Sequence, residues 1–426
     1  MAIKMDILTL SFKQRRPLDI GLQGLDFNFE QTKKVSNSYL PSDAKGKSDL
    51  KTDILTVQIL SLQEAAVKQT EWSDLAGRSL EPNIFYEPDF IIPATLHLVP
   101  SKQPSFVFVR NNSGQLMGVF PFTNQRFNFG SPVMRGWQDV NSALGVPLVD
   151  ATRADAVLLA LMDFVEQSNF KALLFLKIYE NGLFFEALKR VTVLTTTKVQ
   201  PLNKTRRAFL KCRDDAKSFF NNNWSAKKLK NTARLHRRLS DINTVEHKVL
   251  TSSDDIKDAT ERFLSLEISG WKGKTGTALL QKHGHADFTR AMMLEFASKH
   301  KVEIHELYCG ETLIASGIVL QTAEKAWFWK VSHNESFENF SPGVLLVKNL
   351  TQSCLGQDTM KTIDSCAIQN HPMIDSLWTD RVSMVSCMVG TSGFALKIAV
   401  LRETLWHNLW QILRSMYIKL KRSKEN

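Results

Sequence analysis

Apolar positions along the chain follow two periods, which separate strands from helices. Alternation on both sides of the turn NNSGQ predicts a β-hairpin over 104–123. Apolar residues three and four apart predict helices over 154–168 and 253–269. The short run KALLFLKI at 171–178 predicts a buried strand. We therefore expect an α/β protein, or α+β with mixed sheets, rather than an all-helical one.

A similar order of elements occurs twice. The first part reads strand (53–60), helix (61–80), hairpin (104–123), helix (154–168) and strand (171–178). The second part reads strand (243–251), helix (253–269), three strands (301–333), helix (341–355) and strand (360–366). The order hairpin, helix and strand thus occurs in both parts. In the first part, a helix over 181–190 and a strand over 191–200 follow. The recurrence predicts an internal duplication.

The termini differ in pattern from the middle of the chain. The polar stretch SNSYLPSDAKGKSD predicts that residues 1–52 are disordered. Apolar residues three and four apart over 394–420, followed by the basic tail KLKRSKEN, predict an amphipathic helix. That helix could pack on the preceding domain or lie on a membrane surface. No apolar run is long enough to span a membrane.

Charge is concentrated in one segment. The chain has a formal net charge of +11, and most of it lies between Lys204 and Ser240, within a predicted basic helical segment. A solvated basic helix is the simple interpretation, and contact with an anionic ligand or membrane surface is the alternative. Nucleic acid is disfavoured, because aromatic residues are not interleaved with the cations. Five scattered cysteines without a CxxC pair favour a reducing cytoplasm and exclude a disulfide framework.

The turn NFSPGVLL, at 339–346, is the first candidate for chemistry. It opens a predicted helix, and free N–H groups at a helix start can bind phosphate oxygens. Ser341 could cap the helix, Gly343 allows close approach of a ligand, and Val344 and Leu345 would offer backbone groups. An ordinary helix start with proline in the first turn is the structural alternative.

The loop GWKGKTG after the helix at 253–269 is the second candidate. It places Glu267, Trp271 and Lys272 together. A carboxylate shielded by an indole can have its pKa raised toward that of a general base. The alternative is that Trp271 lies in the core and Lys272 in solvent.

Three further residues could serve a substrate site. Lys330 lies on an aromatic strand, where it would bind a ligand only if it faced inward. Asp364 lies at a strand end, and His371 precedes a proline; both residue types can transfer protons. The histidines show no ligand spacing such as HExxH, so we predict no metal site.

Five stretches in order resemble the cellulose-biosynthesis acetyltransferase (CelD-like) group of bacterial proteins, at 71–91, 144–150, 264–279, 329–346 and 363–378. That group belongs to the GNAT acyl-CoA N-acyltransferase superfamily, with a tandem build like the FemABX peptidyltransferases. The resemblance implies two tandem GNAT-like domains and acetyl-CoA or a longer acyl-CoA as co-substrate. It also implies that the CoA pyrophosphate binds at Ser341–Leu345.

The expected organisation combines the pattern with this resemblance. It comprises a disordered segment 1–52, a first GNAT-like domain 53–203, a basic helical connector 204–240, a second GNAT-like domain 241–392 with the acyl-CoA site, and an amphipathic basic helix 393–426. The first domain lacks an SPG-like turn and is expected to contribute only to the cleft.

The leading functional expectation is acyl transfer from acyl-CoA to an amine or hydroxyl, in the cytoplasm or at the inner membrane face. The resemblance suggests a polysaccharide or cell-envelope precursor as acceptor. Glu267 is the first candidate base and Asp364 the second; Trp271, Lys272, Lys330 and His371 would bind the acceptor. The alternatives are a non-catalytic accessory protein of a membrane glycan synthase and aminoacyl transfer from charged tRNA.

Overall fold

Two sets of six strands with the same pairing order make up one continuous mixed sheet. The computed structural model describes residues 32–35, 54–98, 103–125, 132–195, 197–357 and 359–391, and single helical positions between 397 and 409. Along the sheet, the first half contains β2 (Leu55–Leu60), β3 (Ser105–Arg110), β4 (Leu116–Gln125), β5 (Val133–Gly136), β7 (Ala172–Tyr179) and β14 (Asp380–Thr391). The second half contains β9 (Val245–Leu250), β10 (Val302–Cys309), β11 (Thr312–Gln321), β12 (Lys325–His333), β13 (Thr362–Asp364) and β8 (Thr197–Lys211).

The pairing order is the same in both halves. Three antiparallel pairings lead to one parallel pairing, β5 with β7 and β12 with β13, and each set ends in an antiparallel strand. β1 (Thr32–Val35) extends the sheet beyond β2, and the short β6 (Leu148–Val149) pairs with β4. The recurrence predicted from the sequence is therefore present in the topology.

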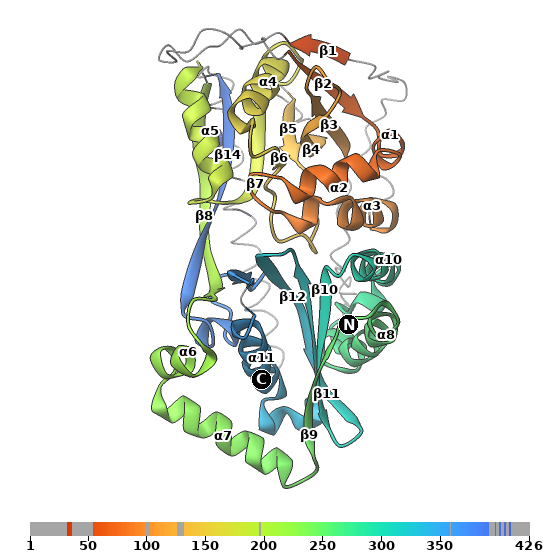
Figure 1. Cartoon of the computed structure of the whole chain (residues 1–426), viewed down its shortest axis with the longest axis vertical. Helices are drawn as coiled ribbons and strands as arrows, with labels where there is room; N and C mark the ends of the chain where they lie inside the picture. The colour runs from red at the N-terminus through yellow and green to blue at the C-terminus, as the bar shows by residue number, and fades with distance from the viewer. Residues whose placement is uncertain are drawn as a thin grey trace, which may run out of the picture. The chain divides into compact units, whose positions relative to one another are not determined.

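The last strand of each half is exchanged. β8 follows the first half along the chain but pairs with β13, and β14 ends the second half but pairs with β7. The two strands pair with each other from Thr197↔Thr391 to Phe209↔Asp380 and lie side by side in Figure 1. β8 thus runs through residue 203, where we predicted the first domain to end, so the placing of domain boundaries stays a prediction.

Helices cover the two halves. Those of the first half are α1 (Leu62–Ala66), α2 (Gln69–Gly77), α3 (Pro88–His97), α4 (Ala154–Glu166) and α5 (Leu183–Leu194). Those of the second are α6 (Ala216–Asn223), α7 (Ala226–Ser240), α8 (Ser253–Ser269), α9 (Trp271–Lys274), α10 (His285–Ser298) and α11 (Pro342–Leu355). No helix among the described residues is long and apolar enough to cross a membrane.

Four local predictions differ from the structure. α5 continues to Leu194, so the strand expected over 191–200 begins only at Thr197. The basic segment begins as part of β8, because the neighbouring strands supply its backbone partners. The loop GWKGKTG contains the single turn α9. Thr32–Val35 is a strand within the segment expected to be disordered. The rest of 1–52, and nearly all of the helix expected over 394–420, lie outside the described residues.

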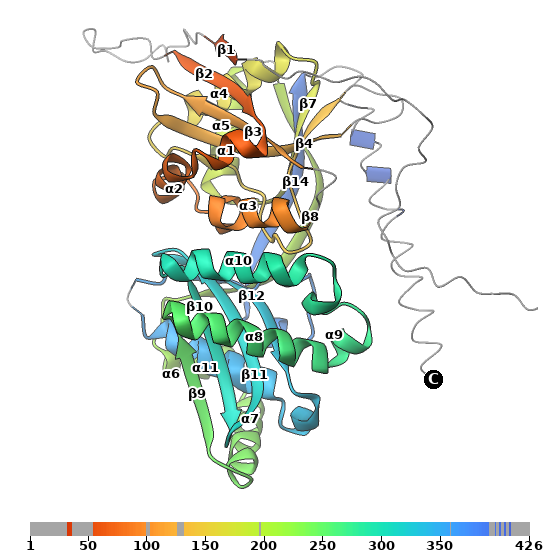
Figure 2. The ribbon, with the colours of Figure 1, turned by 90° about the vertical axis from the view of Figure 1, so that its right-hand side faces the viewer.

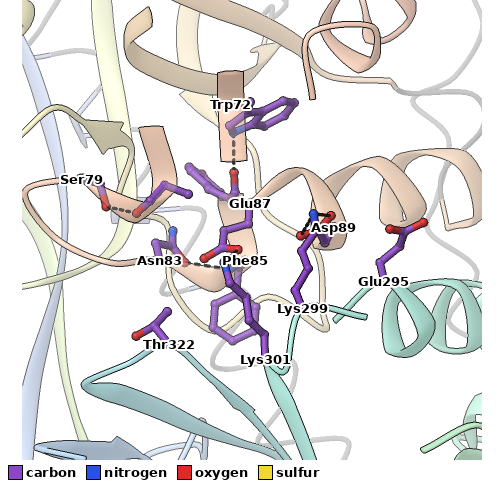
Figure 3. Close-up of polar contacts among 12 residues, drawn as sticks. Trp72, Ser79, Asn83, Phe85, Glu87, Asp89, Glu295, Lys299, Lys301 and Thr322 are labelled. Carbon is purple, nitrogen blue, oxygen red and sulfur yellow. Dashed lines mark hydrogen bonds and ion pairs between the residues drawn. The ribbon is translucent and has the colours of Figure 1, made fainter. Parts of the chain in front are cut away.

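The halves pack through α3 and α10, which lie against each other in Figure 2. Phe90 of α3 meets Phe288 of α10 edge to face, with ring centroids 5.2 Å apart. Beside them, Lys299 Nζ lies 2.6 and 2.7 Å from the two oxygens of Asp89. Lys301 Nζ lies 2.5 Å from Glu87 Oε2. Figure 3 shows both lysines reaching the carboxylates. Because both carboxylates are buried, their charge depends on these partners.

We predict that Lys299→Met lowers the free energy of unfolding by about 2 kcal/mol, since it leaves the Asp89 carboxylate buried without its cation. Chemical denaturation would measure the change. Lys189→Met is a matched control, because Lys189 forms an exposed pair with Glu186 inside one helix and should change stability by less than about 0.5 kcal/mol. The prediction fails if the two variants are equally stable.

Candidate functional site

The paired strands β12 and β13 separate after three residue pairs. Their parallel register runs from Lys325↔Thr362 to Trp327↔Asp364, and there β13 ends while β12 continues to His333. Between the diverging segments lies a cavity of about 1010 Å³. Trp329 and Lys330 line it from one side and Cys366–Asn370 from the other.

A β-bulge at the start of this opening determines how β12 faces the cavity. Ile318 pairs with Lys330 and Val319 with Phe328, so Trp329 is the extra residue. Simple alternation would place Trp329 and Lys330 on opposite faces of the strand. Instead both reach Asn141 of the first half: Trp329 Nε1 donates to its backbone oxygen at 2.8 Å and Lys330 Nζ to its Oδ1 at 2.9 Å.

The corresponding opening in the first half is filled by the chain itself. β5 and β7 also pair over three residues, from Val133↔Ala172 to Arg135↔Leu174. The loop after β5 then returns, and Gly145 packs so tightly there that a Cβ would lie 2.3 Å from the backbone oxygen of Leu176. The space left is about 10 Å³. The cavity of the second half is thus about a hundredfold larger, so of these two openings between described strands it is the one with space for a ligand.

Lys330 is a half-buried amine at the cavity wall. Burial and, next, the nearby Lys272 ammonium lower the pKa of Lys330 to about 8, while the Glu267 carboxylate opposes the change. Its ammonium also lies 4.9 Å from the centre of the Trp329 ring. A lysine with this pKa is partly neutral near pH 8 and can then accept a proton.

Glu267 and Lys272 form a buried ion pair beside the cavity. Lys272 Nζ lies 2.7 Å from Glu267 Oε1 and donates to the Val331 backbone oxygen at 3.2 Å, while the Leu279 N–H donates to Glu267 Oε2 at 2.8 Å. Glu267 is 2% exposed and is not among the residues that line the cavity. Trp271, on α9, is 53% exposed and leaves this carboxylate unshielded by its indole. The expected cluster therefore exists as an ion pair that ties α8 to β12.

Asp364 lies at the end of β13 and is fully buried. Its Oδ2 accepts from the Tyr179 hydroxyl at 2.8 Å and from Arg207 Nη2 at 2.6 Å, and its Oδ1 accepts from the Cys366 N–H at 2.9 Å. These three donors, one of them the Arg207 guanidinium, hold the carboxylate in place. Asp364 thus acts in the structure as the partner of a buried arginine.

The start of α11 lies at the end of β12. Ser341 has a left-handed φ of 52° and makes no side-chain cap. Its backbone oxygen accepts from the N–H groups of Val344 and Leu345, and Pro342 has no N–H, which leaves the Gly343 N–H as the donor of this turn. A Cβ at Gly343 would lie 3.4 Å from Met373 Sδ and 4.0 Å from His333 Nδ1. Leu345 is 2% exposed, so its side chain belongs to the core.

His371 lies in the loop that connects the cavity with Met373. Its Nδ1 accepts weakly from the Ile374 N–H at 3.4 Å, and burial lowers the pKa of this half-buried side chain, opposed by Asp375. A neutral imidazole is therefore expected at pH 7. Within the described residues, no group of His, Cys, Asp and Glu could hold a metal ion.

Sequence reasoning missed the residues that the first half and the exchanged strands bring to the cavity. Asn141, Lys177, Arg206 and Arg207 all line it. None lies in a motif, and they come together only because β8, β14 and the loop after β5 meet at the opening of β12 and β13. A basic segment around Arg206 was visible in the sequence, but its pairing partner was not.

Comparison with known proteins identifies the class of the second half. Residues 226–371 match the family described as "Acetyltransferase (GNAT) domain". This segment runs from α7 to the loop after β13 and contains the opening described above. Residues 226–371 are therefore similar to a GNAT-type acetyltransferase domain, a class that transfers acyl groups from acyl-CoA. No curated protein matches the chain.

Solved structures are similar to most of the chain. FemX is similar at 7% identity and a TM-score of 0.50, over 74% of this chain and 96% of that one. The C-terminal domain (DUF2156) of a putative lysylphosphatidylglycerol synthetase from Agrobacterium fabrum has 10% identity and a TM-score of 0.49, over 79% and 95%. A tandem GNAT protein from the clavulanic acid biosynthesis pathway has 12% identity and a TM-score of 0.39, over 80% and 99%. The likeness to FemX confirms the expected mixed α/β architecture.

We predict that the Lys330 amine gains reactivity with a midpoint near pH 8, against about 10.4 for an ordinary lysine. The midpoint would be measured by mass spectrometry, as the extent to which a small amine-reactive acylating reagent modifies Lys330 at each pH. Two substitutions should move the midpoint in opposite directions. Glu267→Gln removes a neighbouring negative charge and lowers it, whereas Lys272→Met removes a positive charge and raises it. Equal midpoints in the three proteins would show that these charges do not act on Lys330.

Proposed function

We propose that the chain transfers an acyl group from acyl-CoA to an amine or hydroxyl acceptor in the cavity of the second half. The observation that carries this proposal is the separation of β12 and β13 beyond Trp327↔Asp364, with the bulge at Trp329 at its start. The GNAT family match covers the same residues.

The residues around the opening suit an acyl-CoA, which would supply the activated acyl group as a thioester. Gly343 presents one backbone N–H at the start of α11, where the helix dipole favours a phosphate. Ser341, Val344 and Leu345 would position this turn through the backbone, since the N–H groups of the last two are already bonded to Ser341.

Lys330 is the group we assign to proton removal from the acceptor. It lines the cavity, and burial brings its pKa to about 8, so a sizeable neutral fraction is present near that pH. Asn141 holds its amine at 2.9 Å. Glu267 and Asp364, the candidates from the sequence, would act indirectly: Glu267 sets the charge around Lys330 through Lys272, and Asp364 holds Arg207. Trp271 and His371 would border the acceptor.

The acceptor class rests on the resemblance to the CelD-like group, which suggests a polysaccharide or cell-envelope precursor. Such a role would suit a protein that works near the inner membrane face, with the segment over 394–420 as its contact. An accessory protein of a glycan synthase remains the alternative of another class, because such a protein need not bind acyl-CoA.

Calorimetric titration with acetyl-CoA and longer acyl-CoAs tests the proposal. We predict binding by the wild type and a loss of at least about tenfold in Gly343→Asp, since a carboxylate at this turn repels phosphate. Gly343→Asn is the matched control, because it has the same size without the charge and should bind much more tightly than the aspartate variant. A Cβ fits here, with Met373 Sδ at an ordinary 3.4 Å.

Failure of the folded wild type to bind any acyl-CoA would overturn the proposal. The accessory role and aminoacyl transfer from charged tRNA would then be the functions left to test.

Aminoacyl transfer from charged tRNA is a second candidate, favoured by the surface of α7. Lys227, Lys230, Arg234 and Arg237 are exposed on this helix, and no carboxylate among the described residues forms an ion pair with them. The helix contacts the segment Glu335–Phe340 just before α11, and Arg238 lies over the Phe340 ring. An unpaired row of cations beside the site suits a nucleic-acid backbone.

Binding of tRNA measured across salt concentrations distinguishes this candidate. If it holds, the logarithm of affinity falls steeply with the logarithm of salt, and Lys230→Ala with Arg234→Ala reduces the slope by about one for each cation removed. Lys189→Ala, on the surface of the first half, serves as the control and should leave the slope unchanged. A shallow slope that these substitutions do not change would exclude the tRNA-dependent reaction.

A further inference from the structure

The cavity of the second half has a cationic lining to which the other half of the sheet contributes. Lys177 of β7 and Arg206 of β8 line it opposite Lys330, together with the buried Arg207. No Asp or Glu is among the lining residues. The Lys177 and Arg206 side chains are exposed within the cavity and form no hydrogen bond or ion pair with any described residue.

The carboxylates nearest to these cations all have other partners. Asp364 is paired with Arg207, and Glu267 is paired with Lys272. Asp139 accepts from the N–H and the side-chain amide of Asn141 at 2.7 and 2.8 Å. Burial, and then the Arg207 charge, lower the pKa of Lys177, and Asp139 opposes this change without forming an ion pair with the lysine. Because no carboxylate among the described residues forms an ion pair with Lys177 or Arg206, both side chains remain available to a ligand that enters the cavity.

The backbone around the cavity is strained at three points. Among the described residues, five other than glycine have a left-handed φ, and three of them line this cavity: Lys177 at 47°, Cys366 at 55° and Asn370 at 60°. Left-handed backbone is unfavourable for a side chain such as lysine and is concentrated at functional sites. The Ser386 hydroxyl accepts from the Lys177 N–H at 3.1 Å and so helps to hold the strained residue.

We infer that Lys177 and Arg206 bind an oxyanion, a phosphate or a carboxylate, on the acceptor of the transfer reaction. This inference rests on the proposed function and names the chemical class of the acceptor. The acyl-CoA would lie along the wall formed by β12 and the loop after β13, with its pyrophosphate at the start of α11, which is outside the cavity lining. Lys177 and Arg206 belong to the opposite wall, formed by β7, β8 and β14, where the second substrate must enter.

The test is a titration with inorganic pyrophosphate at low ionic strength, in protein saturated with acetyl-CoA. Saturation blocks the cofactor's own phosphate site. Two variants remove the proposed contacts, Lys177→Gly and Arg206→Gln. Glycine is chosen because it suits the left-handed backbone at this position, so loss of binding cannot result from strain. Lys198→Ala is the matched control, since Lys198 is an exposed cation on β8 outside the cavity.

We expect pyrophosphate to bind the acetyl-CoA-saturated wild type, with affinity reduced at least about tenfold in either variant and unchanged in the control. Lys177→Gly should not lower the melting temperature. Two results would overturn the inference. The first is that pyrophosphate does not bind. The second is that acetyl-CoA abolishes pyrophosphate binding and that the variants also bind acetyl-CoA more weakly, which would assign Lys177 and Arg206 to the cofactor. If acetyl-CoA does not bind, the proposed function fails by itself, and titration without it still reports on the oxyanion site.

Discussion

The antiparallel pairing of β8 with β14 is the interaction on which the rest of the structure depends. Each strand leaves the half that precedes it in the chain and completes the other, so neither half of the sheet has its full set of strands alone. Strand pairing satisfies backbone groups that would otherwise be buried without partners, which makes the exchange costly to undo. Both halves are therefore held in a fixed relation at the opening of β12 and β13.

The Arg207–Asp364 pair is formed by this exchange. Arg207 belongs to β8, Asp364 ends β13, and the Tyr179 hydroxyl of β7 joins them at 2.8 Å from Asp364 Oδ2. Arg207 Nη1 also donates to the Ala143 oxygen at 2.9 Å, which fixes the loop that carries Asn141. A buried pair of this kind adds little net stability, but loss of either partner would leave a buried charge. Its role is thus to hold four segments at one edge of the cavity.

The two halves share one pairing order but differ at the opening between their parallel strands. The same parallel pair of strands occurs in both halves, yet in the first half the loop with Gly145 fills the opening and in the second half the opening is empty of chain. The first half still contributes to the cavity, because the same loop contains Asn141, whose backbone oxygen and Oδ1 accept hydrogen bonds from Trp329 and Lys330. Residues of the first half thus line part of the cavity of the second half.

The sequence predicted most of the elements, their repeated order and the class of fold, because hydrophobic period and turn residues are local properties. It missed the strand Thr32–Val35 and the continuation of α5 to Leu194. It also brought Glu267 together with Lys272, since one helix end and one turn separate them. It could not show that Trp329 is a bulge, that β8 is exchanged, or that Lys177 and Arg206 share a cavity with Lys330. These features depend on pairings between residues far apart in the chain, and on burial that lowers the pKa of Lys330 to about 8. Only the tertiary structure decides them, because desolvation and strand register arise once the sheet is complete.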